Sequence, residues 1–346
     1  MRYFQSSLWV TVLGLLLGAG VGYYYTGTTS GALQMLLICA ILAILEVSIS
    51  FDNAVVNATV LKDMTPKWVH RFLTWGMLIA VFGMRLIFPL MIVAVVGHLG
   101  PLEALKLAAF SPNEYAKLMT SVHHEVSAFG GAFLLLVALK YFFDVHKTLH
   151  WISVIEKPLS HMGKLDAIEV GVTLVVIYIM SRLVDPSETL PFIYAGLAGV
   201  LTYLVVDGIG VFLQAPESVR HDVHRASLGM FLYLEVLDAS FSFDGVIGAF
   251  AITNNLFVIT IGLGIGAMFV RSLTILMVDK GTLGAYRFLE HGAFWAVAAL
   301  AAIMFINTVF EIPEVATGLI GATLIGLSIY SSIRQEKRET RKALRL

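Results

Sequence analysis

Long apolar runs separated by short polar segments dominate the chain. A helix needs ~20 predominantly apolar residues to cross the hydrocarbon core of a bilayer, and runs of this kind recur from one end of the sequence to the other. We therefore predict an all-α polytopic membrane protein with about ten transmembrane helices. The predicted spans cover residues 8–25, 32–61, 72–97, 127–143, 166–184, 191–213, 228–252, 256–278, 292–310 and 316–333.

Composition supports the same class. Of the 346 residues, 58% are hydrophobic and 14% are charged, whereas a soluble domain carries about 25% charged residues. This composition predicts that the protein is embedded in a lipid bilayer, which is its first expected partner. The net charge of −1 gives no reason to expect a nucleic-acid partner. The single cysteine, Cys39, excludes a disulfide framework and a thiolate metal cluster.

The positions of lysine and arginine predict the orientation. With the N-terminus inside, 17 of the 23 Lys and Arg residues fall in segments on the inner side, as the positive-inside rule requires. This distribution favours an even number of spans in a plasma (bacterial inner) membrane, with both termini cytoplasmic. Residues 334–346 form a basic cytoplasmic tail. The loops 99–126 and 144–165 are long and amphipathic, and we expect an interfacial helix in each.

Two spans contain nearly the same acidic motif. The first copy reads Glu46-Val-Ser48-Ile-Ser50-Phe51-Asp52, and the second reads Asp238-Ala-Ser240-Phe241-Ser242-Phe243-Asp244. A carboxylate inside a bilayer costs roughly 2.5–3.5 kcal/mol on insertion scales. Each motif contains two acids at the same spacing. Because this costly pair occurs twice, it indicates a polar or charged substrate.

The two motifs lie in the second and seventh predicted spans, an odd offset that makes their helices cross the membrane in opposite directions. Such an arrangement is typical of an inverted repeat, here five spans plus five, with equivalent segments near the bilayer midplane. We predict a first repeat over residues 1–184 and a second, inverted repeat over 185–333. Serine and asparagine weaken the helix interior around the motifs, so we expect interrupted motif helices, with breaks near Asp52 and Asp244.

Each motif helix presents two polar stripes at 100° per residue. In the first copy, one stripe holds Glu46, Ser50, Asn53 and Asn57, and the other holds Ser48 and Asp52. In the second copy, one stripe holds Glu235, Asp238 and Ser242, and the other holds Ser240 and Asp244. All of these side chains can offer oxygen atoms as metal ligands. Oxygen ligands suit Mg²⁺, Ca²⁺ or Mn²⁺ better than copper or zinc. We expect the cation to be a substrate, with no cofactor bound permanently.

Other polar residues have plainer interpretations. Arg85 and Arg271 lie within spans and are possible counter-charges, so the acids could instead serve to lock the helices together. His146 and His150 lie beside basic residues in a predicted loop, and we interpret them as solvated.

At the motifs, the chain resembles the TerC family of integral membrane proteins, within the wider lysine-exporter superfamily. The resemblance rests on Glu46…Ser50-Phe51-Asp52-Asn53-Ala54 and on Glu235-Val-Leu-Asp238-Ala-Ser-Phe241-Ser-Phe243-Asp244. It implies metal-ion transport, with manganese efflux as the activity and tellurium resistance as the historical label. The resemblance makes Asp52, Asn53, Asp238 and Asp244 substrate ligands, to which we add Glu46. Gly245 departs from the serine common in the family, and this chain has more spans than compact members.

Two other functions remain open from the sequence. Asp52 and Asp244 could form the dyad of an intramembrane aspartyl protease, but the Gly-x-Gly-Asp motif of such enzymes is missing before Asp244. The chain could also be a membrane scaffold that transports nothing. We favour a transporter and do not expect an enzyme.

Overall fold

The computed structural model describes residues 2–76, 78–165, 167–213, 222–310 and 312–343. Within these ranges all regular structure is helical, as expected for an all-α protein. The helices are α1 (Gln5–Thr26), α2 (Thr29–Ile49), α3 (Phe51–Leu61), α4 (Pro66–Arg71), α5 (Phe88–Val96), α6 (Pro101–Phe110), α7 (Pro112–Thr120), α8 (His123–Phe142), α9 (Ser153–Met162), α10 (Ile168–Ser181), α11 (Thr189–Leu213), α12 (Asp222–Phe250), α13 (Leu256–Asp279), α14 (Thr282–Ala285), α15 (Leu289–Asn307) and α16 (Glu314–Ala343). Two π-helical stretches, Phe72–Gly76 and Ile79–Ile87, lie between α4 and α5.

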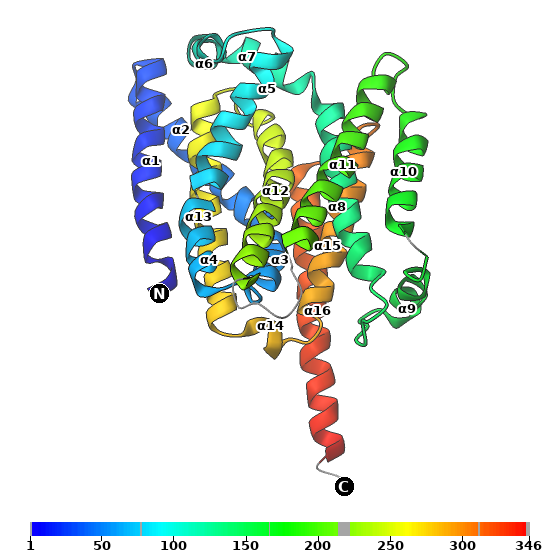
Figure 1. The fold of residues 1–346 in the computed structure, drawn as a ribbon. Helices are drawn as coiled ribbons and strands as arrows, with labels where there is room; N and C mark the ends of the chain where they lie inside the picture. The colour runs from blue at the N-terminus through cyan, green and yellow to red at the C-terminus, as the bar shows by residue number, and fades with distance from the viewer. Residues whose placement is uncertain (1, 77, 166, 214–221, 311, 344–346) are drawn as a thin grey trace.

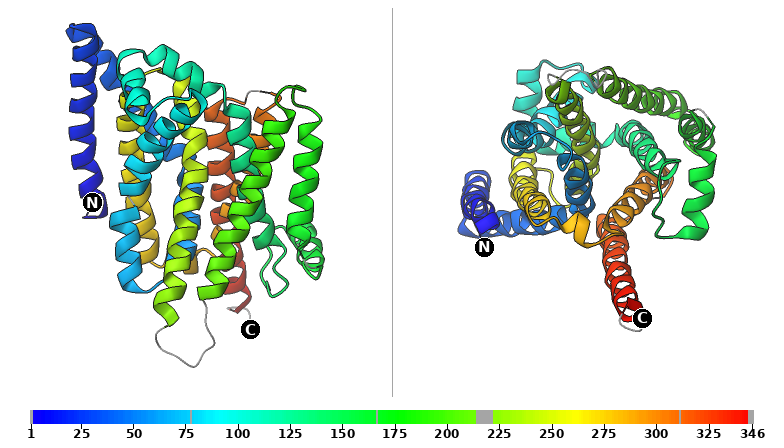
Figure 2. Two further views of the ribbon diagram at one scale, coloured as in Figure 1. Left: turned by 45° about the horizontal axis from the view of Figure 1, so that its top comes forward. Right: turned by 60° about the horizontal axis from the view of Figure 1, so that its bottom comes forward.

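The long helices form one bundle with short helices at both ends. Figure 1 shows α1 at one edge and α10 at the opposite edge, and Figure 2 shows the same arrangement from two further directions. The helices α6 and α7 cover one end, whereas α9, α14 and both chain termini lie at the other (Figure 1). The loops 144–165 and 279–291, predicted to share a side with the termini, thus lie at that end. Both long loops contain the expected short helices.

Eight helices of the described chain are long and apolar enough to cross a membrane. They lie in eight of the ten predicted spans, so the protein is a multi-pass membrane protein. The other two predicted spans correspond to α10 and α12. The α10 helix has 14 residues, which at 1.5 Å per residue reach only ~21 Å. The α12 helix has 29 residues and carries the second acidic motif.

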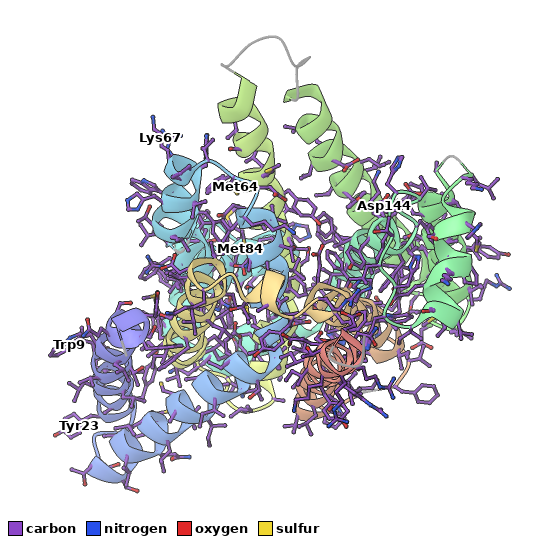
Figure 3. All side chains as sticks on the ribbon, turned by 90° about the horizontal axis from the view of Figure 1, so that it is seen from below. Trp9, Tyr23, Met64, Lys67, Met84 and Asp144 are labelled. Carbon is purple, nitrogen blue, oxygen red and sulfur yellow. The ribbon has the colours of Figure 1, made fainter. Side chains whose placement is uncertain are left out.

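The outer surface of the bundle is apolar, as contact with lipid requires. Trp9 and Tyr23 project from α1 away from the other helices (Figure 3), and their exposed fractions are 70% and 56%. In contrast, the interior around α8 and α15 is densely packed, and Phe133 and Leu136 are fully buried. Soluble monomers rarely expose large contiguous apolar patches, so this surface fits a lipid-bilayer environment.

The first motif helix is interrupted within the motif. The α2 helix ends at Ile49 and α3 begins at Phe51, with Ser50 between them at φ −89° and ψ 17°. The hydroxyl of Ser48 donates to the Ile44 carbonyl at 2.8 Å, and such side-chain bonds compete with regular helical geometry. The interruption therefore lies two residues before Asp52, close to its expected place.

The second motif helix is continuous, so the break expected near Asp244 is wrong. The α12 helix runs through the motif to Phe250. Ser240 Oγ donates to the Val236 carbonyl one turn earlier at 3.0 Å. That bond satisfies the hydroxyl without disturbing the helix, so serine alone does not break it.

Small residues bring α2 close to α13. A Cβ atom at Gly262 would lie 2.6 Å from Leu42 Cβ, and one at Gly266 would collide with the side chain of Glu46. Close approach through glycine is a common device in membrane helix packing. Here it places the acid of the first motif directly against α13.

Candidate cation-binding site

A small cavity with both polar and apolar side chains in its wall lies in the bundle where the two motifs meet. Its volume is about 30 Å³, which suits one ion or water molecule. It is lined by Glu46, Asn53, Asn57, Phe72, Leu73, Gly76, Ala80, Arg85, Glu235, Asp238, Ala267, Val270, Arg271 and Thr274. Residues of both motif helices, of the π-helical stretches and of α13 therefore share one cavity.

Glu46 and Asp238 occupy equivalent positions in the two motifs, and both face this cavity. Asn53 Nδ2 donates to Asp238 Oδ1 at 2.6 Å, which joins α3 directly to α12. The stripe of Glu46, Asn53 and Asn57 predicted from the first motif lines the cavity together with Glu235 and Asp238 of the second. The two copies thus contribute side chains to one common site.

Glu46 is held by an arginine. It forms an ion pair with Arg85, and each side chain is 2% exposed. Ser50 Oγ also donates to Glu46 Oε1 at 3.0 Å, and Arg85 Nη1 donates to the Ala80 carbonyl at 2.6 Å. Glu46 is therefore a buried carboxylate with a charged partner.

Several other oxygen atoms of the site accept no hydrogen bond from the described residues. Five of them, from Asn53, Asn57, Glu235 and Asp238, are buried without a hydrogen-bond partner among the described residues: Asn53 Oδ1, Asn57 Oδ1, Glu235 Oε1, Glu235 Oε2 and Asp238 Oδ2. A buried polar atom without a partner is costly, and native structures contain few of them. Oxygen atoms of carboxylates and amides are the ligands that hard divalent cations take. A cation in this cavity would supply the missing interactions.

The acids do not converge on one point in this structure. No group of three or more His, Cys, Asp or Glu side chains in metal-binding proximity occurs in the part of the chain that is described. The most complete set of potential metal ligands combines carboxylate oxygens with the amide oxygens of Asn53 and Asn57. Glu46 is engaged by Arg85 instead.

Asp52 does not line the central cavity. It borders a separate space of about 10 Å³ against α15 and α16, beside Leu300 and Thr317. Asp52 Oδ1 accepts a hydrogen bond from the backbone N–H of Asn53 at 2.9 Å. It also lies in the first turn of α3, where the helix dipole favours a negative charge. The position of Asp52 on the second predicted stripe, roughly 120° from Glu46, explains this separation.

The other predicted residues are distributed as follows. Ser48 and Ser240 donate to carbonyls of their own helices, at Ile44 and Val236. Ser242 Oγ is buried and lacks a partner among the described residues. Arg271 lines the cavity, and no ion pair joins it to a described residue. The side chain of Asp244 lies outside the described residues.

A second cavity, of about 390 Å³, opens between α8, α10, α11 and α12 and is lined by charged and tyrosine side chains. Lys140 Nζ lies 3.7 Å from Asp207 Oδ2 and 4.0 Å from Glu169 Oε1. Asp144 and Gly163, at the ends of the 144–163 segment, form part of its wall. This cavity is thus a polar space beside the helices that carry the site.

Sequence reasoning missed a buried charge cluster around Glu156, on α9. The Glu156 side chain is 1% exposed, and its carboxylate accepts from Trp295 Nε1 at 3.0 Å and from His291 Nδ1 at 2.8 Å. The amides of Trp151 and Ile152 also donate to it. These bonds attach α9 and the loop before it to α15. They join residues about 135 positions apart, so no local pattern could have indicated them.

Two basic side chains lie at the edge of this cluster. Lys147 Nζ and His150 Nδ1 are each 3.8 Å from Glu156 Oε2. Burial lowers the pKa of Lys147 to about 8, although Glu156, Glu290 and Asp144 act in the opposite direction. Burial on its own raises the pKa of Glu156, but the hydrogen bonds from His291 and Trp295 outweigh it and lower that pKa to about 2. Glu156 is therefore an ionised structural anchor.

Comparison with known proteins gives one match. The family model described as "Protein of unknown function (DUF475)" covers residues 51–339. The chain belongs to the DUF475 family. The match begins at Phe51, where α3 starts, and includes the whole second motif. No curated protein and no solved structure matches the chain. The family description names no activity, and the TerC resemblance stays a prediction.

Proposed function

We propose that this DUF475 protein is a secondary transporter of a divalent cation, with its substrate site in the cavity between the two motifs. The observation that carries the proposal is the set of buried oxygen atoms on Asn53, Asn57, Glu235 and Asp238 that have no donor among the described residues. These atoms come from two helices far apart in the sequence, and they surround a space of ion size. A cation would satisfy them, whereas a purely architectural role would leave them unexplained.

Manganese is the proposed substrate, and export is the proposed direction. Both rest on the resemblance to the TerC family, because the oxygen ligands alone fit Mn²⁺, Ca²⁺ and Mg²⁺. The proposed membrane is the plasma membrane, with both termini in the cytoplasm, as the distribution of lysine and arginine indicates. Export from the cytoplasm then begins at the end of the bundle that contains α9 and α14.

Transport requires that the site bind weakly enough to release its ion. Three acids, Glu46, Glu235 and Asp238, line the cavity, so protons could replace the cation when it leaves. We therefore propose that cation movement is coupled to protons moving in the opposite direction. Such coupling would keep the buried charge near balance during the cycle.

The test is cation flux in proteoliposomes with the internal pH recorded at the same time. Purified protein is reconstituted, and Mn²⁺, Ca²⁺ and Mg²⁺ are offered separately. Asp238→Asn removes a charge but keeps the shape, and we expect it to lower Mn²⁺ flux by at least about tenfold, since even supporting groups of metal sites are worth 10–100-fold. Ser48→Ala is the matched control, because Ser48 is exposed and bonds only to its own helix.

A clear result would decide the proposal. We expect the Ser48 variant to transport like the wild type and the Asp238 variant to insert normally without transporting. If the wild type moves none of the three cations, or if Asp238→Asn transports at the wild-type rate, the proposed function is wrong.

A further inference from the structure

The charges around the central cavity are unevenly paired. Three carboxylates, on Glu46, Glu235 and Asp238, and two guanidinium groups, on Arg85 and Arg271, line it. Among the described residues only one ion pair forms between these groups, from Arg85 to Glu46. Glu235 and Asp238 retain oxygen atoms that have no donor in the described part of the chain. One arginine therefore neutralises one acid and leaves the other two available.

The pairing of Arg85 is incomplete for a structural lock. Its Nη2 contacts Glu46, and its Nη1 donates to the Ala80 carbonyl. The third donor, Nε, is buried without a partner among the described residues. A buried ion pair contributes to stability only when its remaining hydrogen-bonding groups are also satisfied. Arg85 thus holds Glu46 at a cost that stability alone does not explain.

Arg85 also occupies an unusual backbone. It lies in the π-helical stretch Ile79–Ile87, and π-helical turns are rare and frequent at functional sites. A change of one residue in helical register rotates a side chain by roughly 100°. The Arg85 carbonyl is fixed to α13 by Thr260 Oγ1 at 3.0 Å. This contact gives the segment a fixed point, about which neighbouring turns can rearrange.

From these observations we propose that Arg85 is a tethered counter-cation that competes with the transported ion for Glu46. In this structure the guanidinium neutralises Glu46. When a divalent cation enters, Arg85 releases Glu46, which joins Glu235 and Asp238 as a third carboxylate ligand. This inference rests on the proposed function and adds a regulatory role for one residue. It also accounts for the pairing of Glu46 with Arg85, while Glu235 and Asp238 keep oxygen atoms without donors among the described residues.

Competition of this kind favours release of the ion. The arginine is always charged and is attached beside the site, so it returns to Glu46 as soon as the ion leaves. Removing Arg85 therefore tightens binding but slows turnover. A merely structural arginine would do neither, because its loss would weaken folding and binding together.

The test measures Mn²⁺ affinity at equilibrium in purified full-length protein. The variants are Arg85→Gln, Glu46→Gln, the double variant, and Arg271→Gln as a matched control. Arg271 lines the same cavity but has no ion pair with a described residue, so its loss removes the same charge without freeing Glu46. We expect Arg85→Gln to lower the Kd about tenfold, or ~1.4 kcal/mol, and to slow Mn²⁺ flux. Arg271→Gln should lower the Kd less, and the double variant should bind like Glu46→Gln.

Several results would overturn this inference. If the double variant regains wild-type binding while both single variants lose it, the pair is only a structural lock. If Arg85→Gln and Arg271→Gln tighten binding equally, a general charge effect is sufficient. Should Arg85→Gln fail to fold, Arg85→Lys replaces it, because lysine cannot keep both the Glu46 and Ala80 contacts. We expect a smaller tightening there, and unchanged affinity would refute the competition.

Failure of the proposed function looks different. In that case the wild type itself binds no Mn²⁺, Ca²⁺ or Mg²⁺ at millimolar concentration. If the wild type binds the cation and Arg85 variants bind no more tightly, only the role of Arg85 is wrong.

Discussion

Replacing Glu156 with glutamine should destabilise the protein without touching the cation site. The carboxylate is buried and accepts bonds from His291, from Trp295 and from two backbone amides. Glutamine keeps one acceptor oxygen. Its NH₂ group would replace the second carboxylate oxygen and would face hydrogen-bond donors. The variant therefore loses charge-assisted hydrogen bonds and leaves buried donors unpaired.

The size of the effect follows from the pKa of Glu156. A fall from the ordinary 4.5 to about 2 corresponds to ~3 kcal/mol, at 1.36 kcal/mol per unit. Breaking a buried ion pair by removing one partner costs a similar ~3–5 kcal/mol. We therefore expect Glu156→Gln to lower the free energy of unfolding by about 3 kcal/mol. Because the pKa is lowered on folding, this contribution is present above pH ~4.5 and disappears as the pH falls through about 2.

The assay is denaturant or thermal unfolding of purified protein in detergent between pH 3 and 8. Glu290→Gln is the control, since Glu290 forms an exposed ion pair with Lys62 at 3.5 Å, and such pairs contribute ~0–1 kcal/mol. Cation affinity should be unchanged in both variants. If Glu156→Gln is as stable as Glu290→Gln at pH 7, the buried cluster does not anchor α9 and this reasoning is refuted.

Three further predictions follow from single contacts. Lys147 has a pKa lowered to about 8, so the free energy of unfolding should rise by up to ~3 kcal/mol as the pH increases from 8 to 10.5. In Lys147→Met, unfolding measurements should show no such rise, and an equal rise in both proteins would contradict the prediction. Gly262→Ala should cost ~1–3 kcal/mol by overpacking against Leu42, whereas Gly20→Ala, with open space around it, should not destabilise. Asp52→Asn should keep more Mn²⁺ flux than Asp238→Asn, because Asp52 borders a separate cavity; equal loss would show that Asp52 also serves the ion.

The sequence indicated much of the fold because apolar periodicity is a local property. All ten predicted spans correspond to helices, and the stripe of Glu46, Asn53 and Asn57 lines the cavity with Asp238. The same geometry separated Asp52 from that stripe, although family resemblance had placed it among the ligands. Helical rotation was the better guide to where Asp52 lies.

Two features could not be predicted, for different physical reasons. Similar serine-rich motifs gave a break at Ser50 but a continuous helix in α12, since side-chain hydrogen bonding is compatible with both outcomes. The bonds of Glu156 to His291 and Trp295 connect a loop helix to a distant span. Such contacts depend on tertiary packing, which a single sequence does not encode in any local pattern.

The most direct measurement of the central claim is the position of the ion itself. Anomalous scattering at the manganese edge, from protein prepared with Mn²⁺, would locate it without assumptions about mechanism. We predict one peak in the central cavity, within about 2.0–2.6 Å of carboxylate oxygens of Asp238 and Glu235 and of the Asn53 amide oxygen, and absent in Asp238→Asn. A peak elsewhere in the protein, in a preparation that transports Mn²⁺, would contradict the account.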